Sequence, residues 1–175
     1  MKLTSKEARN ILEQERANAK EDMWIEHCIC VGDTAGIIAK ALVEKGIAVD
    51  VDKTIALGYI HDVGKYNGES HGHVMRGYEY LKNKGYDDKY YNICLTHSYL
   101  NNDIICTAGG VPDVNANPFL TDFIKNHKYT IEEKLINLCD LMCPQGGKVF
   151  TIDKRLIDIM IRRGAYSNTQ CHIKE

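Results

Sequence analysis

The chain has 175 residues, of which 44% are hydrophobic and 26% are charged, with a formal net charge of −2. These values are typical of one globular domain with a sizeable hydrophobic core, and they argue against a nucleic-acid scaffold held by phosphate contacts. No apolar run approaches the roughly 20 residues of a membrane helix and the first residues do not resemble a signal peptide, so a cytoplasmic protein that does not enter membranes is predicted.

The first part of the chain reads as two helices. The capping box Thr4-x-x-Glu7 predicts a helix that continues to about Lys20, and apolar residues at helical spacing predict a second from Trp24 to Glu44. We expect three parts: an N-terminal helix packed on the domain (residues 1–22), the domain itself (23–166) and a loose C-terminal tail (167–175).

The most informative stretch is His61-Asp62-Val63-Gly64-Lys65, which follows a short apolar segment. Asp52 is a plausible N-cap for a helix here, and Gly64 is a natural residue to end it. Asp62 would then lie in the last helical turn, where the helix dipole disfavours a negative charge by up to about 1 kcal/mol. A compensating cation is therefore expected, either Lys65 or a metal ion.

The sequence of the second half of the chain predicts further helices. One opens at His73 and ends near Gly85, and the next starts near Asp88 and carries His97 near its end. Residues 99–118 show no periodicity, and they are interpreted as a lid or substrate loop. The alternative is a flexible insertion without a function. The remaining predicted helices cover residues 118–127, a segment opened by the capping box Thr130-x-x-Glu133, and residues 153–163 with Leu156, Ile157, Met160 and Ile161 facing inward. Hardly any segment alternates with period two, so the predicted fold is all-α.

The seven cysteines are an odd number, which indicates free thiols. Cys28-x-Cys30 and Cys139-x-x-x-Cys143 raise the alternative of a structural zinc site. Neither has the Cys-x-x-Cys spacing and both lie in helical patterns, so thiols in the core are the preferred interpretation.

Histidines and acids recur near predicted helix ends and core edges. Apart from one adjacent pair, each comes from a different helix, and ligands that project inward from several helices build metal sites in helical bundles. A mixture of imidazole and carboxylate suits a divalent ion such as Mn, Fe, Ni, Co or Zn. The candidate ligands are His27, His61, Asp62, His73, His97 and Asp140. His127 and His172 match no pattern and are predicted to be solvated.

From about Trp24 to Met142 the order of these residues resembles the HD-domain superfamily of metal-dependent phosphohydrolases. The hallmark is a first His (His27), a His-Asp pair (His61-Asp62) and a distant Asp (Asp140). The string His-Asp-Val-Gly-Lys looks like the family's HD-[IV]-G-K variant. The resemblance implies an all-α bundle of roughly six to eight helices in a single domain.

The resemblance also implies the ligand sets. The first metal would take His27, His61, Asp62 and Asp140. His73 and His97 match the further histidines of members that hold two metals, and there Asp62 would bridge to the second ion. His71 is a rival to His73, which is preferred because Gly77 follows it by one helical turn.

The implied activity is hydrolysis of a phosphate ester or anhydride of a small molecule, with a nucleotide favoured, by water activated by one or two divalent ions (Mn, Fe, Ni, Co, Zn or Mg). Asp62 and Lys65 are the predicted catalytic residues, and Lys65 and Arg76 the predicted substrate-binding residues. The small phosphorylated substrate is the expected partner, with no nucleic acid and no membrane, and a homodimer is left open. The alternatives are an HD-like di-iron oxygenase and a degenerate HD module that binds a ligand without turnover.

Overall fold

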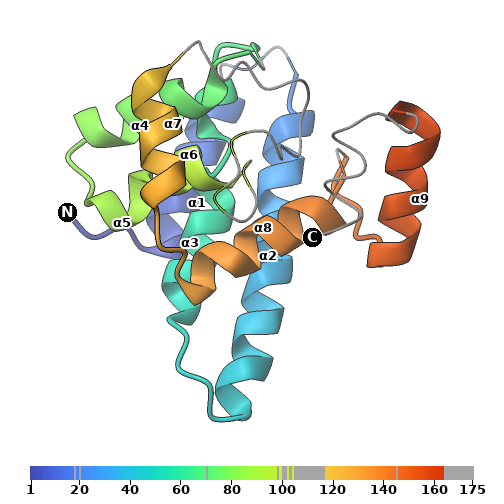
Figure 1. The fold of residues 1–175 in the computed structure, drawn as a ribbon. Coiled ribbons are helices and arrows are strands. Elements are labelled where there is room, and N and C mark those ends of the chain that lie inside the picture. Colours follow the sequence, from blue (N-terminus) through green and yellow to red (C-terminus); the bar gives the residue numbers. More distant parts are fainter. Residues whose placement is uncertain are drawn as a thin grey trace.

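The computed structural model describes residues 1–17, 19, 21–69, 71–97, 99, 102, 104, 117–144 and 146–163. Regular structure in this part of the chain is helical, which confirms the all-α prediction (Figure 1). In chain order the elements are α1 (Ser5–Arg16), α2 (Met23–Glu44), α3 (Val51–Ile60), the 3-10 turn η1 (Val63–Lys65), α4 (His73–Asn83), α5 (Asp88–Tyr91), α6 (Ile93–Thr96), α7 (Pro118–Asn126), α8 (Ile131–Met142) and α9 (Ile152–Arg163).

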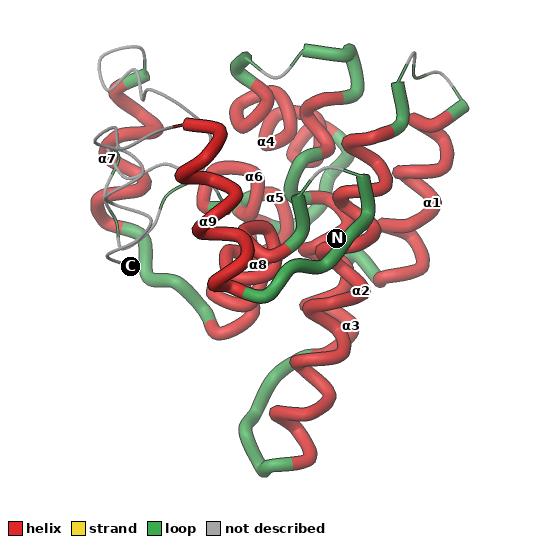
Figure 2. Tube along the Cα trace, turned by 90° about the vertical axis from the view of Figure 1, so that its right-hand side faces the viewer, coloured by secondary structure: helices red, strands yellow, loops and turns green. Residues whose placement is uncertain are grey.

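The centre of the fold is the pair α2 and α3, with α1 and α8 packed against it (Figure 2). The two helices approach closely because glycines face each other: a Cβ at Gly58 would lie 2.4 Å from the Cα of Gly32. Side chains from α1, α2, α3, α4 and α8 fill one core, which is why the site residues at the ends of these helices are held in fixed positions. Fully buried members include Leu12, Ile25, Val31, Leu57, Ile60, Leu81 and Ile136.

Two helix starts behave as their sequences predict. Thr4 and Thr130 form capping boxes with Glu7 and Glu133, and these open α1 and α8. The predicted N-cap of α3 is wrong by two residues. Asp50 has extended backbone and its carboxylate accepts a hydrogen bond from the Lys53 amide, whereas Asp52 accepts one from the Ser5 hydroxyl at 2.5 Å.

The prediction that Gly64 ends α3 is also wrong. The helix ends at Ile60, and Gly64 lies buried in η1, so Asp62 is placed after α3 and not in its last turn. A Cβ on Gly64 would lie 1.9 Å from the carbonyl oxygen of His73 and 2.5 Å from the amide nitrogen of Gly77. Glycine is therefore required because the backbones of η1 and α4 touch.

The predicted inward face of α9 is mostly exposed. Ile157 and Ile161 are 58% and 79% exposed, Met160 is also exposed, and Ile159 is the buried member of this helix. Helix α9 contacts α8, and Arg155 Nε donates a hydrogen bond to the carbonyl of Leu141 at 2.9 Å.

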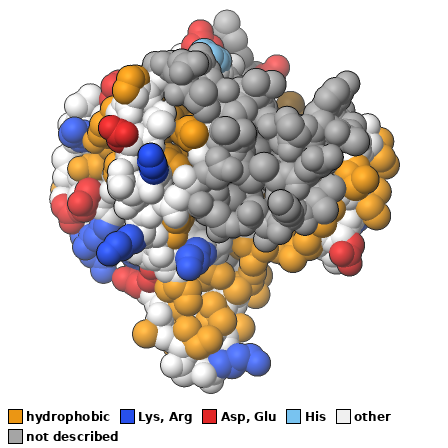
Figure 3. Space-filling view, in the orientation of Figure 1, with side chains coloured by type: hydrophobic (Ala, Val, Ile, Leu, Met, Phe, Trp, Pro, Cys, Tyr) orange, Lys and Arg blue, Asp and Glu red, His pale blue; other side chains and the backbone are white. Residues whose placement is uncertain are grey.

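Most of the predicted loop (99–118) and the whole predicted tail (167–175) lie outside the described residues. In the described part, no helix combines the length and apolarity that crossing a membrane would need. Figure 3 shows hydrophobic side chains on the protruding end formed by α2 and the segment that leads to α3. Within α2, Ile37 is 70% exposed.

Candidate metal centre

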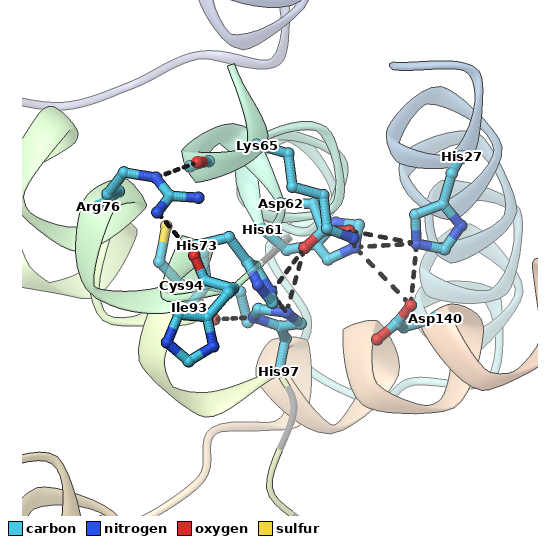
Figure 4. Close-up of polar contacts among 12 residues, drawn as sticks. His27, His61, Asp62, Lys65, His73, Arg76, Ile93, Cys94, His97 and Asp140 are labelled. Carbon is cyan, nitrogen blue, oxygen red and sulfur yellow. Dashed lines mark hydrogen bonds and ion pairs between the residues drawn. The ribbon is translucent and has the colours of Figure 1, made fainter. Parts of the chain in front are cut away.

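The structure brings all six predicted ligands to one place between the helices (Figure 4). Their places in the fold are His27 in α2, His61 and Asp62 between α3 and η1, His73 at the start of α4, His97 directly after α6 and Asp140 in α8. Their donor atoms form two trios, and in each trio the atoms lie within 4.8 Å of one another.

The first trio is His27, His61 and Asp140. The Nε2 atom of His27 lies 2.9 Å from Oδ1 of Asp140 and 3.2 Å from Nε2 of His61. The distance from His61 Nε2 to Asp140 Oδ1 is 3.8 Å. Two imidazole nitrogens and one carboxylate oxygen thus face a common point.

The second trio is Asp62, His73 and His97. The Oδ1 atom of Asp62 lies 3.1 Å from Nε2 of His73 and 3.4 Å from Nε2 of His97. The other oxygen of Asp62, Oδ2, lies 3.8 Å from His27 Nε2 and 3.7 Å from His61 Nε2. The Asp62 carboxylate therefore belongs to the second trio through Oδ1 and faces the two histidines of the first trio through Oδ2.

Backbone hydrogen bonds set the orientation of two rings. Nδ1 of His61 donates to the carbonyl of Gly58 at 2.7 Å, and Nδ1 of His97 donates to the carbonyl of Ile93 at 3.0 Å. A neutral imidazole that donates from Nδ1 has its lone pair on Nε2, which is the atom that both rings direct toward the centre.

The electrostatics suit metal coordination. Burial lowers the pKa of His61 to about 4 despite the opposing charges of Asp62 and Asp140, so the ring is neutral near pH 7. Burial alone would raise the pKa of Asp62 and of Asp140, but Lys65 beside Asp62 and His27 beside Asp140 hold both well below their usual range. Both carboxylates are ionised at neutral pH.

The residues fit a divalent ion. The Nε2 atoms of His61 and His97 face the oxygens of two ionised carboxylates, and a cation between them would be attracted by both carboxylates. Oδ1 of Asp62 is buried and accepts no hydrogen bond, although burying such an atom costs about 1–3 kcal/mol. Four imidazoles and two carboxylates suit Mn, Fe, Co, Ni or Zn better than a thiolate-binding ion.

Lys65 lies at the centre and Arg76 does not. The ammonium of Lys65 forms a close ion pair with Oδ2 of Asp62, and although burial would lower the pKa of Lys65, Asp62 raises it. Arg76 points to the other side of η1, where its guanidinium donates to the carbonyls of Gly64 (2.9 Å) and His71 (2.7 Å). The substrate-binding role predicted for Arg76 finds no support in these contacts, which instead hold the segment before α4.

Of the two histidines that could occupy the same ligand position, His73 lies at the candidate centre and His71 does not. His73 belongs to the second trio, whereas the side chain of His71 is exposed and belongs to neither trio. Figure 4 shows the His73 ring directed at Asp62.

His127 is not solvated, and that prediction was wrong. Its Nε2 lies 2.9 Å from Oε1 of Glu133, which also accepts a hydrogen bond from the Thr96 hydroxyl at 3.3 Å. Thr96 directly precedes the candidate ligand His97, so this network links α8 to the end of α6. In the sequence, Glu133 is recognised only as part of a capping box, and its contacts with His127 and Thr96 could not be predicted from that motif.

Cys28, Cys139 and Cys143 are buried, as expected of thiols in the core.

The metal-free protein should be most stable near pH 6.5. Burial would lower the pKa of His27, but Asp140 outweighs it and raises the pKa above its ordinary 6.5. The stabilisation from His27 is therefore complete below pH 6.5 and is lost as the pH rises through the raised value. The pKa of His61 is lowered to about 4, so its contribution, on the order of 3 kcal/mol, is present above pH 6.5 and is lost as the pH falls toward 4.

Thermal unfolding of chelator-treated protein between pH 4.5 and 8.5 checks this expectation. His27→Gln should remove the decline above pH 6.5 and leave the decline below it. A melting temperature that keeps rising from pH 6.5 to 8.5 would contradict the His27–Asp140 pairing.

One comparison with known proteins matches the part of the chain that carries the site. A model of the HD domain matches residues 24–143, a range that contains all six candidate ligands. A Methanocaldococcus jannaschii protein described as uncharacterized is 34% identical over 73 residues, or 42% of this chain and 43% of that protein. The chain therefore matches less than half the length of this curated relative. No solved structure matches the chain. Since the HD model covers well over half of the residues, the chain belongs to the HD-domain family.

Proposed function

We propose that the chain hydrolyses a phosphate ester or anhydride of a small molecule, with nucleotides as the substrate class, in a reaction that depends on divalent metal. The observation that carries this proposal is the Asp62 carboxylate, whose two oxygens face the histidines of both trios. His27, His61 and Asp140 would hold one ion and His73 and His97 the other, with Asp62 shared. When bound, such ions favour deprotonation of water and withdraw charge from a phosphoryl oxygen.

Lys65 is the chain's own contribution to charge stabilisation. Its ammonium is largely buried and directed at the centre by Asp62. A cation held in place before the reaction stabilises negative charge that develops on a phosphoryl group, and such preorganised groups contribute about 10²–10³ in rate. We propose that Lys65 binds a phosphoryl oxygen of the substrate.

Nucleotides are favoured because the site offers a cation and candidate metal ligands for a phosphate, and because small single-domain proteins with this order of ligands resemble nucleotide hydrolases. A net charge of −2 leaves nucleic acid disfavoured as the substrate.

The test is a phosphate-release screen of metal-depleted protein. Nucleoside monophosphates, dinucleoside polyphosphates and guanosine polyphosphates are offered with Mn, Fe, Co, Ni, Zn or Mg, and bound metal is quantified in parallel. We expect up to two ions per chain and phosphate release only with metal. Oxygen consumption with a small polyol and no phosphate release would favour the oxygenase alternative, and a protein that neither binds metal nor turns over would favour a ligand-binding module.

Replacement of His73 should separate the two trios. His73→Gln removes one imidazole from the second trio and leaves the first intact, so we expect about one ion per chain and a loss of at least roughly 10²-fold in kcat. His71→Gln is the matched control, because His71 lies two residues away and is exposed. Elemental analysis and steady-state kinetics measure both. Two ions in His73→Gln, or a loss in His71→Gln alone, would overturn the choice of His73.

A further inference from the structure

Buried side-chain polar atoms without a hydrogen-bond partner are few in the described residues, and two of the three belong to the candidate centre. They are Nδ1 of His27, Oδ1 of Asp62 and Oδ1 of Asn137. Such atoms are costly, so they mark places where a bound group completes the hydrogen bonding. Two of the three belong to candidate metal ligands, and the third, Asn137, has no role so far.

Asn137 lies on α8 between two residues whose side chains contact the candidate centre or its neighbours. It follows Glu133 by four residues and precedes Asp140 by three, and residues at these spacings share one side of a helix. Both neighbours contact the site's surroundings: Glu133 bonds to Thr96 beside His97, and Asp140 lies 2.9 Å from His27. Asn137 therefore lies between Glu133 and Asp140 on the same side of α8.

The amide of Asn137 is fixed by its own helix. Its Nδ2 donates to the carbonyl of Glu133 at 3.0 Å, which identifies the remaining atom as the oxygen. This oxygen is a pure acceptor, so the group that completes it must bring an N–H or O–H. A metal ion at either trio would already be supplied with donors, which leaves a substrate hydroxyl or a buried water as the source.

We infer that Asn137 is a specificity-determining residue that accepts a hydrogen bond from a hydroxyl of the substrate, and this inference rests on the proposed function. One helical turn, about 5 Å, separates Asn137 from Asp140 along α8. A hydroxyl several bonds from the phosphorus matches that offset, and the sugar hydroxyls of a nucleoside 5′-phosphate are such groups. The chemical class is a phosphorylated molecule with a sugar hydroxyl.

The test compares adenosine 5′-monophosphate with its 2′,3′-dideoxy analogue, each with the metal that gives the highest activity. A site that bonds a hydroxyl discriminates against the analogue that lacks it. We expect the ratio of kcat/KM for the two substrates to be well above one in the original protein and to fall by about 10- to 100-fold in Asn137→Ala. Lys134→Ala, an exposed position on the same helix, should keep the original ratio.

The outcomes are distinguishable. If the original protein releases phosphate from neither compound, nor from any other in the screen, the proposed function fails. If it hydrolyses both and Asn137→Ala lowers both by the same factor, a buried water is the partner of Oδ1 and the inference about the hydroxyl is overturned. Equal metal content and equal helical circular dichroism in Asn137→Ala and the original protein show that a changed ratio is not a folding defect.

Discussion

Asp62→Asn should abolish phosphate release, with a loss of at least about 10³-fold, and should lower metal binding at both trios. The reason is that Asp62 supplies an oxygen to each trio and is almost fully buried. The replacement keeps the shape of the side chain and removes its charge, so the site loses one of the two anions that make it attractive to a cation. Elemental analysis and the phosphatase assay measure the two effects.

The same change leaves Lys65 without its ion pair. Removing one partner of a buried pair costs about 3–5 kcal/mol, so the melting temperature should fall while helical circular dichroism at low temperature persists. The double variant Asp62→Asn/Lys65→Met removes the uncompensated charge and should recover stability without recovering activity. Asp122→Asn, an exposed acid on α7, is the control for charge removal. Full activity in Asp62→Asn would refute the assigned centre.

Gly64→Ala should have the largest effect on folding of any single methyl group added near the site. The new Cβ would lie 1.9 Å from the carbonyl oxygen of His73 and 2.5 Å from the Gly77 amide, and backbone atoms cannot rotate away as a side chain can. Inserting atoms into a packed region costs about 1–3 kcal/mol when side chains yield, so a larger loss is expected here. Because η1 and α4 would separate, Lys65 and His73 should be displaced together.

Urea unfolding and metal analysis measure this result. Gly46→Ala provides the comparison, because its Cβ would meet nothing within 4 Å and its cost comes only from a φ of +80°. That cost is about 1 kcal/mol. If Gly64→Ala were no worse than Gly46→Ala, the direct contact between η1 and α4 would be wrong.

Features that depend on neighbouring residues could be predicted from the sequence. The two threonine capping boxes and the start of α4 at His73 depend on hydrogen bonds and spacing within one turn. The all-α class followed from periodicity. The convergence of six ligands could be anticipated only because their order resembles a known family, since no local rule places His27 beside Asp140.

Features that depend on distant contacts were missed. Gly64 looks like a helix terminator until α4 is seen against it, and His127 looks solvated until Glu133 is found beside it. Arg76 follows a candidate ligand by three residues, yet its guanidinium is directed to loop carbonyls. In each case the decisive partner is brought near by tertiary packing, which the sequence pattern around the residue does not contain.

The tight crossing of α2 and α3 at Gly32 and Gly58 has a consequence for the order of assembly. These helices are consecutive in the chain, so His27, His61 and Asp62 come together through a short-range hairpin that forms readily. Asp140 arrives much later along the chain, on α8. An ion bound by all four residues would therefore link α8 to the α2–α3 hairpin after the hairpin has formed. Removal of the ion by a chelator should raise the hydrogen-exchange rate of α8 amides before that of amides in α2 or α3.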